Sequence, residues 1–363
     1  MDSPQRTPLF EFHGEHGGRF VDFAGWEMPV QYRSILEEHR AVRTAAGLFD
    51  VSHMGELFVT GRQAELFLNH LVTNDVSGLS RGRVLYTPMC QPDGGVVDDL
   101  LVYCLGKTEF LLCVNAANIS RDFDWIREEA ASYECGLEDR SSNYGLLALQ
   151  GPRADAILQT LTDEELDRIC YYHFVEGLVA GVPCLISRTG YTGERGFELF
   201  CPAEEADPLA RAILHAGRDR ELALAGLGAR DSLRLEAGFS LYGHEISESI
   251  SPIQAGLQWT VKFGKPDFVG RSALLAQHEN GTESRVAFFR TGDRRIVRVD
   301  SSVFSGDREV GRVLSGTLSP VLNEAIGSML VESDSIENEL TTEIRGRRQN
   351  LRLTKLPFVA LKK

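Results

Sequence analysis

Apolar residues recur along the chain with two different periods, and these predict helices and strands in a mixed order. A spacing of three to four residues predicts helices over residues 34–46, 64–72, 121–131, 152–161, 203–216 and 231–237. Apolar runs and alternating positions predict strands over residues 56–60, 99–104, 110–114, 146–149, 184–188 and 196–201. Because the two kinds of element do not alternate strictly, the order favours an α+β fold over a doubly wound parallel sheet.

The pattern changes after about residue 280. A polar segment that contains glycine, residues 278–282, is followed by short strand-like segments over 286–290, 309–314, 340–344 and 351–354. Glycines between these segments indicate turns. We therefore expect a boundary between residues 1–279 and a small all-β domain over residues 280–363. The basic run at 345–349 is expected to be a solvated hairpin tip.

Composition and charge exclude several classes of protein. The 363 residues include 38 Lys and Arg against 52 Asp and Glu, a net charge of −14, which argues against non-specific binding to nucleic acid. The longest uncharged apolar stretch, about residues 178–186, is too short to span a membrane. Seven cysteines, without a Cys-x-x-Cys pair, argue against a disulfide framework or a zinc site. No targeting segment precedes residue 7, so we expect a cytoplasmic protein.

Two adjacent carboxylates open the predicted strand after the Asp-Gly-Gly turn at residues 93–95. Because side chains alternate along a strand, Asp98 and Asp99 should point to opposite faces. A carboxylate that faces an interior or a cleft needs a partner or a function, since desolvation of a lone charge is unfavourable. The alternative is that both side chains lie at the wet end of the strand and cap the turn.

Residues 187–198 have the pattern of a strand, a glycine-rich turn and a second strand. Gly190, Gly193 and Gly196 permit positive φ angles or a close approach of the backbone. Their spacing is not that of a dinucleotide fingerprint, and no P-loop lysine follows. Glu198 alternates with apolar neighbours, so it belongs either to an exposed polar face of the second strand or to a site.

Other charged residues and histidines allow structural explanations. Arg230 and Asp231, at the start of a predicted helix, could form a local ion pair. His13 and His16 are expected to be a surface pair. His53 is expected to be a structural histidine with its hydrogen bonds satisfied.

Several runs, in this order, closely resemble the T-protein of the glycine cleavage system, a tetrahydrofolate-dependent aminomethyltransferase. The resemblance extends over nearly the whole chain up to about residue 275. The runs that carry it are residues 6–10, 22–29, 49–55, 94–100, 114–118, 149–152, 187–198, 226–231 and 235–238.

The resemblance implies a fold and a reaction. The family folds as three subdomains in a cloverleaf around a central folate channel, so residues 1–279 would hold two interleaved α+β subdomains and residues 280–363 a β-barrel. The reaction takes an aminomethyl group from the lipoyl arm of the partner H-protein. Tetrahydrofolate captures the one-carbon unit, and ammonia, 5,10-methylenetetrahydrofolate and dihydrolipoyl H-protein result.

The resemblance also implies site residues. The family's catalytic carboxylate matches Asp99, which would orient the folate ring and stabilise cationic character as it develops. The carboxylate of Glu198 suits the paired N–H donors of a pterin, and no metal is needed. The residues expected to bind the folate are Met54, Tyr86, Asp99, Val114, Tyr171, Tyr191, Glu198 and Arg230.

Two alternatives share the scaffold. Folate-dependent demethylases take methyl groups from sulfonium or N-methyl donors, but the Asp98–Asp99 pair and the 187–198 run fit the aminomethyltransferase better. Folate-binding accessory proteins of iron–sulfur assembly carry a cysteine in the Gly-Tyr-Gly region, and this chain has none between Cys184 and Cys201. The tail at 357–363 lacks the aromatic and basic ending of bacterial relatives, so a folate contact by the tail is not carried over.

Overall fold

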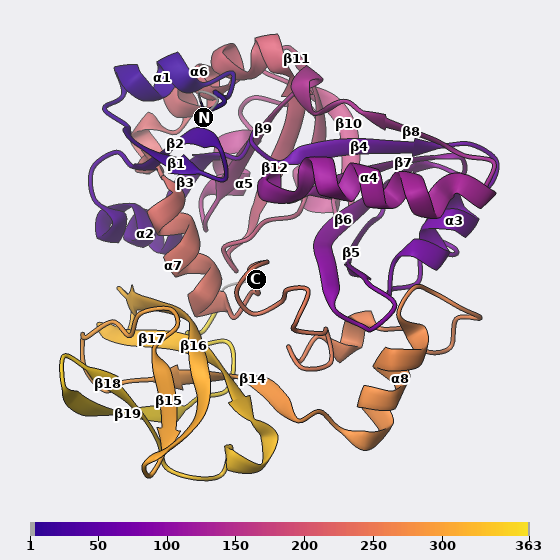
Figure 1. Ribbon diagram of the computed structural model, residues 1–363. Helices are drawn as coiled ribbons and strands as arrows, with labels where there is room; N and C mark the ends of the chain where they lie inside the picture. The colour runs from indigo at the N-terminus through magenta and orange to yellow at the C-terminus, as the bar shows by residue number, and fades with distance from the viewer. Residues whose placement is uncertain (1–3, 362–363) are drawn as a thin grey trace.

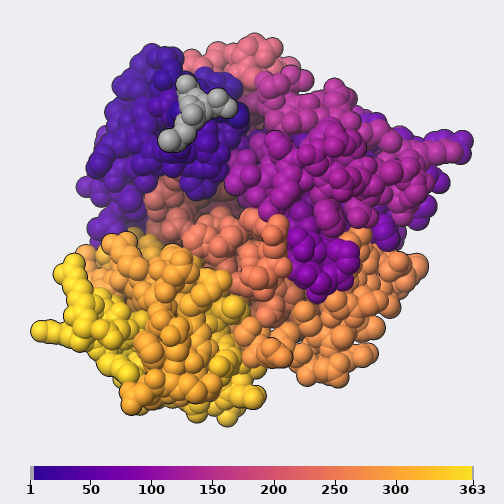
Figure 2. Space-filling model, viewed as in Figure 1, coloured from indigo at the N-terminus to yellow at the C-terminus, as the bar shows by residue number. Residues whose placement is uncertain are grey.

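Three separate sheet systems make up the part of the chain that the computed structural model describes, residues 4–361 (Figure 1). They are a six-stranded sheet, a five-stranded sheet and a closed barrel, accompanied by a two-stranded hairpin. The expected α+β class with a C-terminal all-β barrel is confirmed. In the space-filling view (Figure 2), the salmon and orange segment after helix α7 lies between the three lobes.

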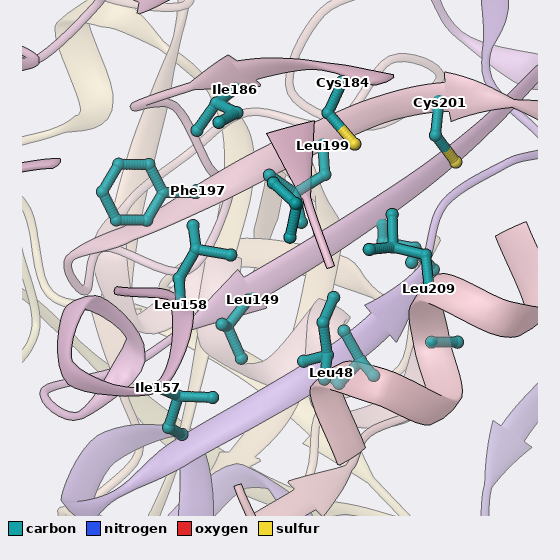
Figure 3. Packing of buried hydrophobic residues seen from close by; sticks show 14 of the residues in the cluster. Leu48, Leu149, Ile157, Leu158, Cys184, Ile186, Phe197, Leu199, Cys201 and Leu209 are labelled. Carbon is teal, nitrogen blue, oxygen red and sulfur yellow. The ribbon is translucent and has the colours of Figure 1, made fainter. Parts of the chain in front are cut away.

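The six-stranded sheet has the order β10-β11-β12-β9-β3-β13. Its central strands are apolar on one face, which packs under helices α5 and α6, as Leu48, Leu149, Leu199 and Leu209 show in Figure 3. The strands are β3 (Ala46–Asp50), β9 (Tyr144–Gln150), β10 (Phe174–Val179), β11 (Val182–Ser187), β12 (Gly196–Pro202) and β13 (Leu222–Leu224), and the helices are α5 (Ala154–Leu158) and α6 (Ala206–Ala216).

The five-stranded sheet has the order β5-β6-β7-β4-β8 and lies, in the sequence, between β3 and β9. Helices α3 and α4 cover one of its faces, where Leu57, Phe67, Leu100 and Ile126 are buried together. The strands are β4 (Gly55–Thr60), β5 (Val84–Cys90), β6 (Val96–Gly106), β7 (Glu109–Val114) and β8 (Gly136–Asp139), and the helices are α3 (Ala64–Leu71) and α4 (Ile119–Glu129).

The remaining faces of the two sheets pack against each other. One buried cluster joins Phe58 and Tyr103 of the five-stranded sheet to Ala148 and Phe200 of the six-stranded sheet. Leu233 of helix α7 (Leu227–Ala237) belongs to the same cluster. Any polar side chain that points to this inter-sheet face is therefore removed from bulk water and close to groups from both sheets.

The rest of the N-terminal part surrounds these sheets. It consists of α1 (Phe10–Glu15), the hairpin of β1 (Arg19–Phe23) and β2 (Trp26–Gln31), α2 (Ile35–Thr44) and, after α7, α8 (Arg271–Asn280). A polar linker was expected at residues 278–282, but helix α8 extends to Asn280. The prediction is therefore wrong for residues 278–280.

The C-terminal barrel closes in the order β14-β17-β16-β15-β18-β19. Its interior holds Phe289, Val303, Val313 and Met329. The expected hairpin tip at 345–349 is confirmed for Arg345 and Gly346, an exposed turn with positive φ at both residues. Residues 347–349 belong to the last strand, and Gln349 is buried. The strands are β14 (Ser284–Arg290), β15 (Ser302–Ser305), β16 (Arg308–Ser319), β17 (Glu324–Glu332), β18 (Leu340–Ile344) and β19 (Arg347–Leu353).

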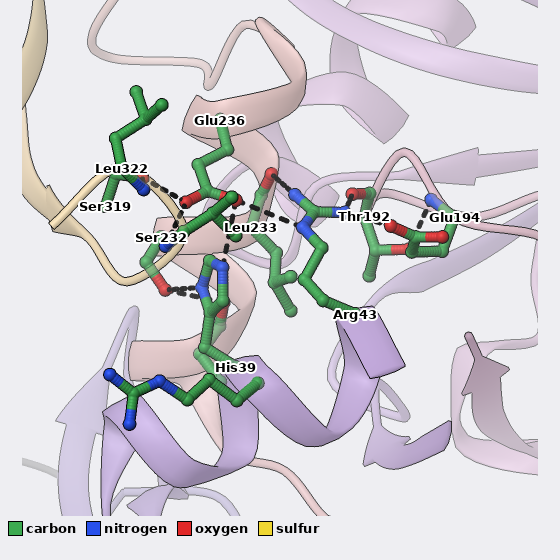
Figure 4. A network of polar contacts seen from close by, with 12 residues as sticks. His39, Arg43, Thr192, Glu194, Ser232, Leu233, Glu236, Ser319 and Leu322 are labelled. Atoms are coloured by element: carbon green, nitrogen blue, oxygen red, sulfur yellow. Dashed lines mark hydrogen bonds and ion pairs between the residues drawn. The ribbon is translucent and has the colours of Figure 1, made fainter. Parts of the chain in front are cut away.

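A buried polar network ties α2, α7, the barrel and the 187–198 turn together (Figure 4). Glu236 lies at its centre: its Oε2 is 2.9 Å from Nε2 of His39 and accepts from Nε of Arg43 at 3.0 Å, while its Oε1 accepts from the hydroxyl of Ser319. Arg43 also donates to the carbonyl of Thr192 at 2.7 Å and to Glu194 at 3.0 Å. We call this group the Glu236 network.

Several predicted helix ends are wrong. Helix α4 begins at Ile119, two residues earlier than expected, and α7 begins at Leu227 instead of residue 231. Gly238 ends α7 in the left-handed conformation that glycine favours, with φ 79°, whereas Gly217 ends α6 with φ −86°. Gly226, the residue before α7, donates its N–H to Glu38 at 3.0 Å, a contact with another part of the fold that local periodicity does not report.

Candidate active site

Asp99 lies on β6 of the five-stranded sheet and faces the six-stranded sheet. Its neighbours on the same face of the strand, Leu101 and Tyr103, pack in or against the inter-sheet cluster. Tyr86, on the adjacent strand β5, donates its hydroxyl hydrogen to Oδ2 of Asp99 at 3.0 Å. Asn115, just after β7, donates Nδ2–H to Oδ1 of Asp99, also at 3.0 Å. Both oxygens of this half-buried carboxylate are therefore held in place.

Asp98 points to the opposite face, toward α4, and its side chain is 0 % exposed. It accepts three hydrogen bonds: from the backbone N–H of Asn115 at 3.0 Å, from Asn115 Nδ2 at 2.9 Å and from Asn118 Nδ2 at 2.7 Å. The strand alternation that the sequence predicts is confirmed, and the alternative of two carboxylates at a wet strand end is wrong.

The environment of Asp99 disfavours its ionised form. Burial and the negative charge of Asp98 raise the pKa of Asp99 well above the usual carboxyl range, against the hydrogen bonds from Tyr86 and Asn115. A carboxyl group with such a raised pKa, between two packed sheets, is a candidate for function on physical grounds.

Glu198 lies on the middle of β12 and is 8 % exposed, so the exposed-strand alternative is wrong. Its Oε2 accepts from the hydroxyl of Thr189 at 2.5 Å. Among the described residues no donor reaches Oε1. Burial raises the pKa of Glu198, while the hydrogen bond from Thr189 and the charge of Arg230 oppose that rise. This carboxylate has unused capacity to accept a hydrogen bond.

Arg230 and Tyr191 form the third part of the site. The guanidinium carbon of Arg230, on the first turn of α7, lies 4.6 Å from the centre of the Tyr191 ring, a cation–π contact. The ion pair that the sequence suggested between Arg230 and Asp231 is wrong, because Asp231 accepts instead from Nε of Arg234 at 2.9 Å. Tyr191 stacks on Phe239 and donates its hydroxyl hydrogen to the backbone of residue 240.

The charges of Asp99 and Arg230 both act on Tyr191, which links the two halves of the site. After burial, the charges that act on the pKa of Tyr191 include Asp99 and Arg230, and Arg230 acts in turn on Glu198. The structure thus brings together Asp99 and Tyr86 of the five-stranded sheet with Glu198 and Tyr191 of the six-stranded sheet and Arg230 of α7.

The other three predicted residues lie at different distances from this group. Tyr171 is 53 % exposed and meets Tyr172 edge to face, with ring centres 4.6 Å apart. Met54 packs against the inter-sheet cluster. Val114 is buried in the core on the far face of the five-stranded sheet, so its side chain does not join the polar group.

Sequence reasoning missed several residues of the site. Asn115 bridges both carboxylates, and it lies within the 114–118 run that the resemblance had marked. Tyr172 has φ 59°, an unusual conformation for a tyrosine, and the charges of Glu198 and Asp99 act on it. Trp259, which is far from Tyr86 in the sequence, stacks on its ring, with the two ring centres 5.9 Å apart. Only Asn115 carried a sequence signal.

His53 differs from its prediction. It is buried, as a structural histidine should be, but Nδ1 has no hydrogen-bond partner among the described residues. Burial and the positive charge of Arg230 lower the pKa of His53 to about 4, so its ring is neutral at pH 7.

Within residues 4–361, no group of His, Cys, Asp or Glu side chains has an arrangement that could hold a metal ion. No helix in the same range is long and apolar enough to cross a membrane.

Comparison with known proteins decides the family. The GCVT N-terminal domain matches residues 9–265, and the glycine cleavage T-protein C-terminal barrel domain matches residues 285–360. The chain belongs to the glycine cleavage T-protein family. Members of this T-protein family are folate-dependent aminomethyltransferases of the glycine cleavage system, and this chain is an enzyme of that class.

Full-length relatives of the T-protein family agree with this assignment. The aminomethyltransferase of Halothermothrix orenii is 47 % identical over 98 % of this chain and 100 % of its own length. The aminomethyltransferase of Moorella thermoacetica is 49 % identical over 99 % of this chain and 98 % of its own length. The crystal structure of the glycine cleavage system aminomethyltransferase T from Bartonella henselae superposes with a TM-score of 0.93, at 34 % identity over 99 % of both chains.

Proposed function

We propose that this enzyme moves the aminomethyl carbon of S-aminomethyldihydrolipoyl H-protein to tetrahydrofolate, in the space between the two sheets and α7. The carbon–sulfur and carbon–nitrogen bonds of the aminomethyl group break, and bonds to N5 and N10 of the folate form. The two hydrogens that leave N5 and N10 appear on the thiol of dihydrolipoyl H-protein and in ammonia, so the reaction balances without an oxidant or a metal.

One observation carries this proposal: Asp99 is a carboxylate whose two oxygens are fixed by Tyr86 and Asn115 at the inter-sheet face. When Asp99 is ionised, its fixed negative charge in a water-poor site stabilises cationic character on the transferred carbon without reorganisation during the reaction. It also orients the ring that attacks, which makes Asp99 the catalytic residue.

The remaining residues fit the binding of the folate. Glu198 can accept from paired N–H donors of a pterin through its free Oε1, as argued from its hydrogen bonds. Arg230 and Tyr191 offer a charged and an aromatic surface beside it. The full binding set that we propose is Met54, Tyr86, Asp99, Val114, Tyr171, Tyr191, Glu198 and Arg230. Val114 would take part through its backbone, because its side chain lies in the core on the far face of the five-stranded sheet.

The wider assignments are proposals as well. We propose residues 1–279 as the folate-binding part and residues 280–363 as the barrel domain, the lipoylated H-protein as partner, and no role for metal, nucleic acid or membrane. A reducing, cytoplasmic location fits the seven cysteines, none of which is paired.

The direct test supplies the wild-type protein with aminomethylated H-protein and tetrahydrofolate and measures ammonia and 5,10-methylenetetrahydrofolate together. We expect equal amounts of both products and no transfer when the folate is omitted. N-methyl and sulfonium donors serve as the comparison. Methyl transfer from either donor, without transfer from the H-protein, would replace the proposal by the demethylase alternative.

A further inference from the structure

A third carboxyl group, Asp122, lies behind the Asp98–Asp99 pair. Asp122 belongs to α4, which covers the face of the five-stranded sheet to which Asp98 points, and it is 0 % exposed. Its side chain contacts that of Asp98. Neither of its two oxygens receives a hydrogen bond from the described residues. The function proposed above assigns no role to Asp122.

The three carboxyl groups, which we call the carboxylate cluster, are unequally supplied with donors. Asp98 accepts three N–H hydrogen bonds and Asp99 accepts one N–H and one O–H. Asp122 accepts none. A buried carboxylate is least stable in its ionised form when no donor reaches it. Of the three groups, Asp122 is therefore the one on which the cluster should retain a proton.

The charges around Asp122 support the same placement. Burial and the negative charge of Asp98 raise the pKa of Asp122 far above its usual value, and Asp99 adds to the rise. Arg121 is the cation that opposes it, but its guanidinium is engaged with the carbonyl of residue 97 and with Glu248, 3.1 Å away. Besides Asp99 itself, the titratable groups whose pKa is raised by the charge of Asp98 or Asp99 include Tyr86, Cys113, Asp122, Tyr172, Tyr191 and Tyr242.

We propose that Asp122 is a positioning residue of the aminomethyl transfer, whose carboxyl group stays protonated at neutral pH and donates its hydrogen to Asp98. This inference rests on the role proposed for Asp99. The donated hydrogen is a fourth one for Asp98, which the two asparagines hold in place. Because Asn115 also holds Asp99, the orientation and the protonation of the catalytic carboxylate depend on this contact.

Infrared spectroscopy tests the protonation without any measurement of activity. At pH 7 the wild-type protein should show a carbonyl stretch of a protonated carboxyl group that Asp122→Asn removes. Glu56→Gln is the matched control, since Glu56 is another buried carboxyl group without a donor on either oxygen, and its loss must leave the Asp122 band in place. If the wild-type spectrum has no band that Asp122→Asn removes, the proposal is wrong.

The pH profile of turnover tests the link to the reaction. A protonated Asp122 carries no charge, so Asp122→Asn should leave the acidic limb of the profile in place, whereas Asp98→Asn removes a real charge and should move that limb to lower pH. Asp122→Leu deletes the donor and should lower kcat about 10-fold, in the range seen for groups that orient a working side chain, and Asn should rescue it.

The outcomes separate this inference from the proposed function. An equal shift of the acidic limb in Asp122→Asn and Asp98→Asn would overturn the inference, since Asp122 would then be ionised. If the wild-type protein transfers nothing, the proposed function fails but the infrared band still reports on Asp122. Should Asp122→Leu not fold, the comparison of Asp122→Asn with the wild-type protein decides the question.

Discussion

Two buried charged groups in this molecule are built in opposite ways. In the Glu236 network, burial alone would raise the pKa of Glu236, but hydrogen bonds from His39 and Ser319 and the charge of Arg43 bring it below its usual value. In the carboxylate cluster, burial and like charges together raise the pKa of Asp99. The arrangement around Glu236 stabilises the fold. The arrangement around Asp99 disfavours its charge, as is common for carboxyl groups at functional sites.

The position of each group explains the difference. The Glu236 network joins α2, α7, the barrel and the turn that carries Tyr191, so its ion pairs fix the relative positions of the lobes. The carboxylate cluster lies within one sheet and its covering helix and holds no lobe to another. Loss of charge should therefore destabilise the protein at Glu236 and impair turnover at Asp99.

The largest expected effect is on stability. Arg43→Met leaves the buried Glu236 without its cation and should lower the free energy of unfolding by about 3–5 kcal/mol, the usual range for breaking a buried ion pair. Chemical denaturation measures it. Arg40→Met, an exposed position on the same helix, should change stability by less than about 0.5 kcal/mol. Equal losses in both variants would show that the network contributes nothing particular.

The next effect is on turnover. Asp99→Asn keeps the volume and removes the charge, so ammonia release should fall about 10²–10³-fold while the protein stays folded. Folate affinity should change less, because the ground state depends less on the charge. Asp98→Asn should instead reduce stability more than turnover. Near-normal turnover in Asp99→Asn would mean that the wrong carboxylate has been assigned.

A smaller effect concerns folate recognition. Glu198→Gln keeps the shape but cannot accept equally from two N–H donors, so folate affinity should weaken by about 1.5–3 kcal/mol, the range for hydrogen bonds to charged groups. Calorimetry with tetrahydrofolate measures it. Glu176→Gln, exposed on strand β10 of the same sheet, is the control and should leave the affinity unchanged. An unaltered affinity in Glu198→Gln removes this residue from the site.

The smallest effect is a difference in pH dependence between the two groups. The pKa of Asp99 is raised on folding, so its stabilising contribution is full below the ordinary carboxyl range and is lost as pH rises through the raised value. Asp99→Asn should therefore melt above the wild-type protein by about 1–3 °C at alkaline pH, and by less at acidic pH.

Glu236 should show the opposite sign in the same melting series. Its pKa is lowered on folding, so its contribution is present above the unfolded pKa and is lost as pH falls through the folded value. Glu236→Gln should melt below the wild-type protein at neutral pH, with a deficit that shrinks toward acidic pH. The same sign for both variants would remove the contrast between the two groups.

The sequence predicted what local pattern and resemblance encode. Periodicity located most helices and strands and the change to a β domain, and alternation placed Asp98 and Asp99 on opposite faces. It failed where the partner lies far along the chain. His13 was expected at the surface, yet it is buried with Nε2 2.8 Å from Asp50.

Asp122 and Trp259 illustrate the same limit within the site. On α4, Asp122 looks like a favourable acidic residue in a first turn, and only the tertiary structure brings it against Asp98. Trp259 lies in a single 3₁₀ turn, Gln258–Thr260, too short to show periodicity, and its contact with Tyr86 depends on the packing of that turn against β5. Neither contact has a local signature.

The insertion of one sheet into another has a consequence for the folding kinetics. Strand β3 pairs with β9 about a hundred residues later, which would demand an unfavourable closure of a long loop. The five-stranded sheet occupies that interval, and its strands β4 and β8, at the two ends of the insert, pair with each other. Once the inserted sheet has formed, β3 and β9 emerge as neighbours, so we expect this sheet to gain protection from hydrogen exchange first during refolding and the six-stranded sheet to follow.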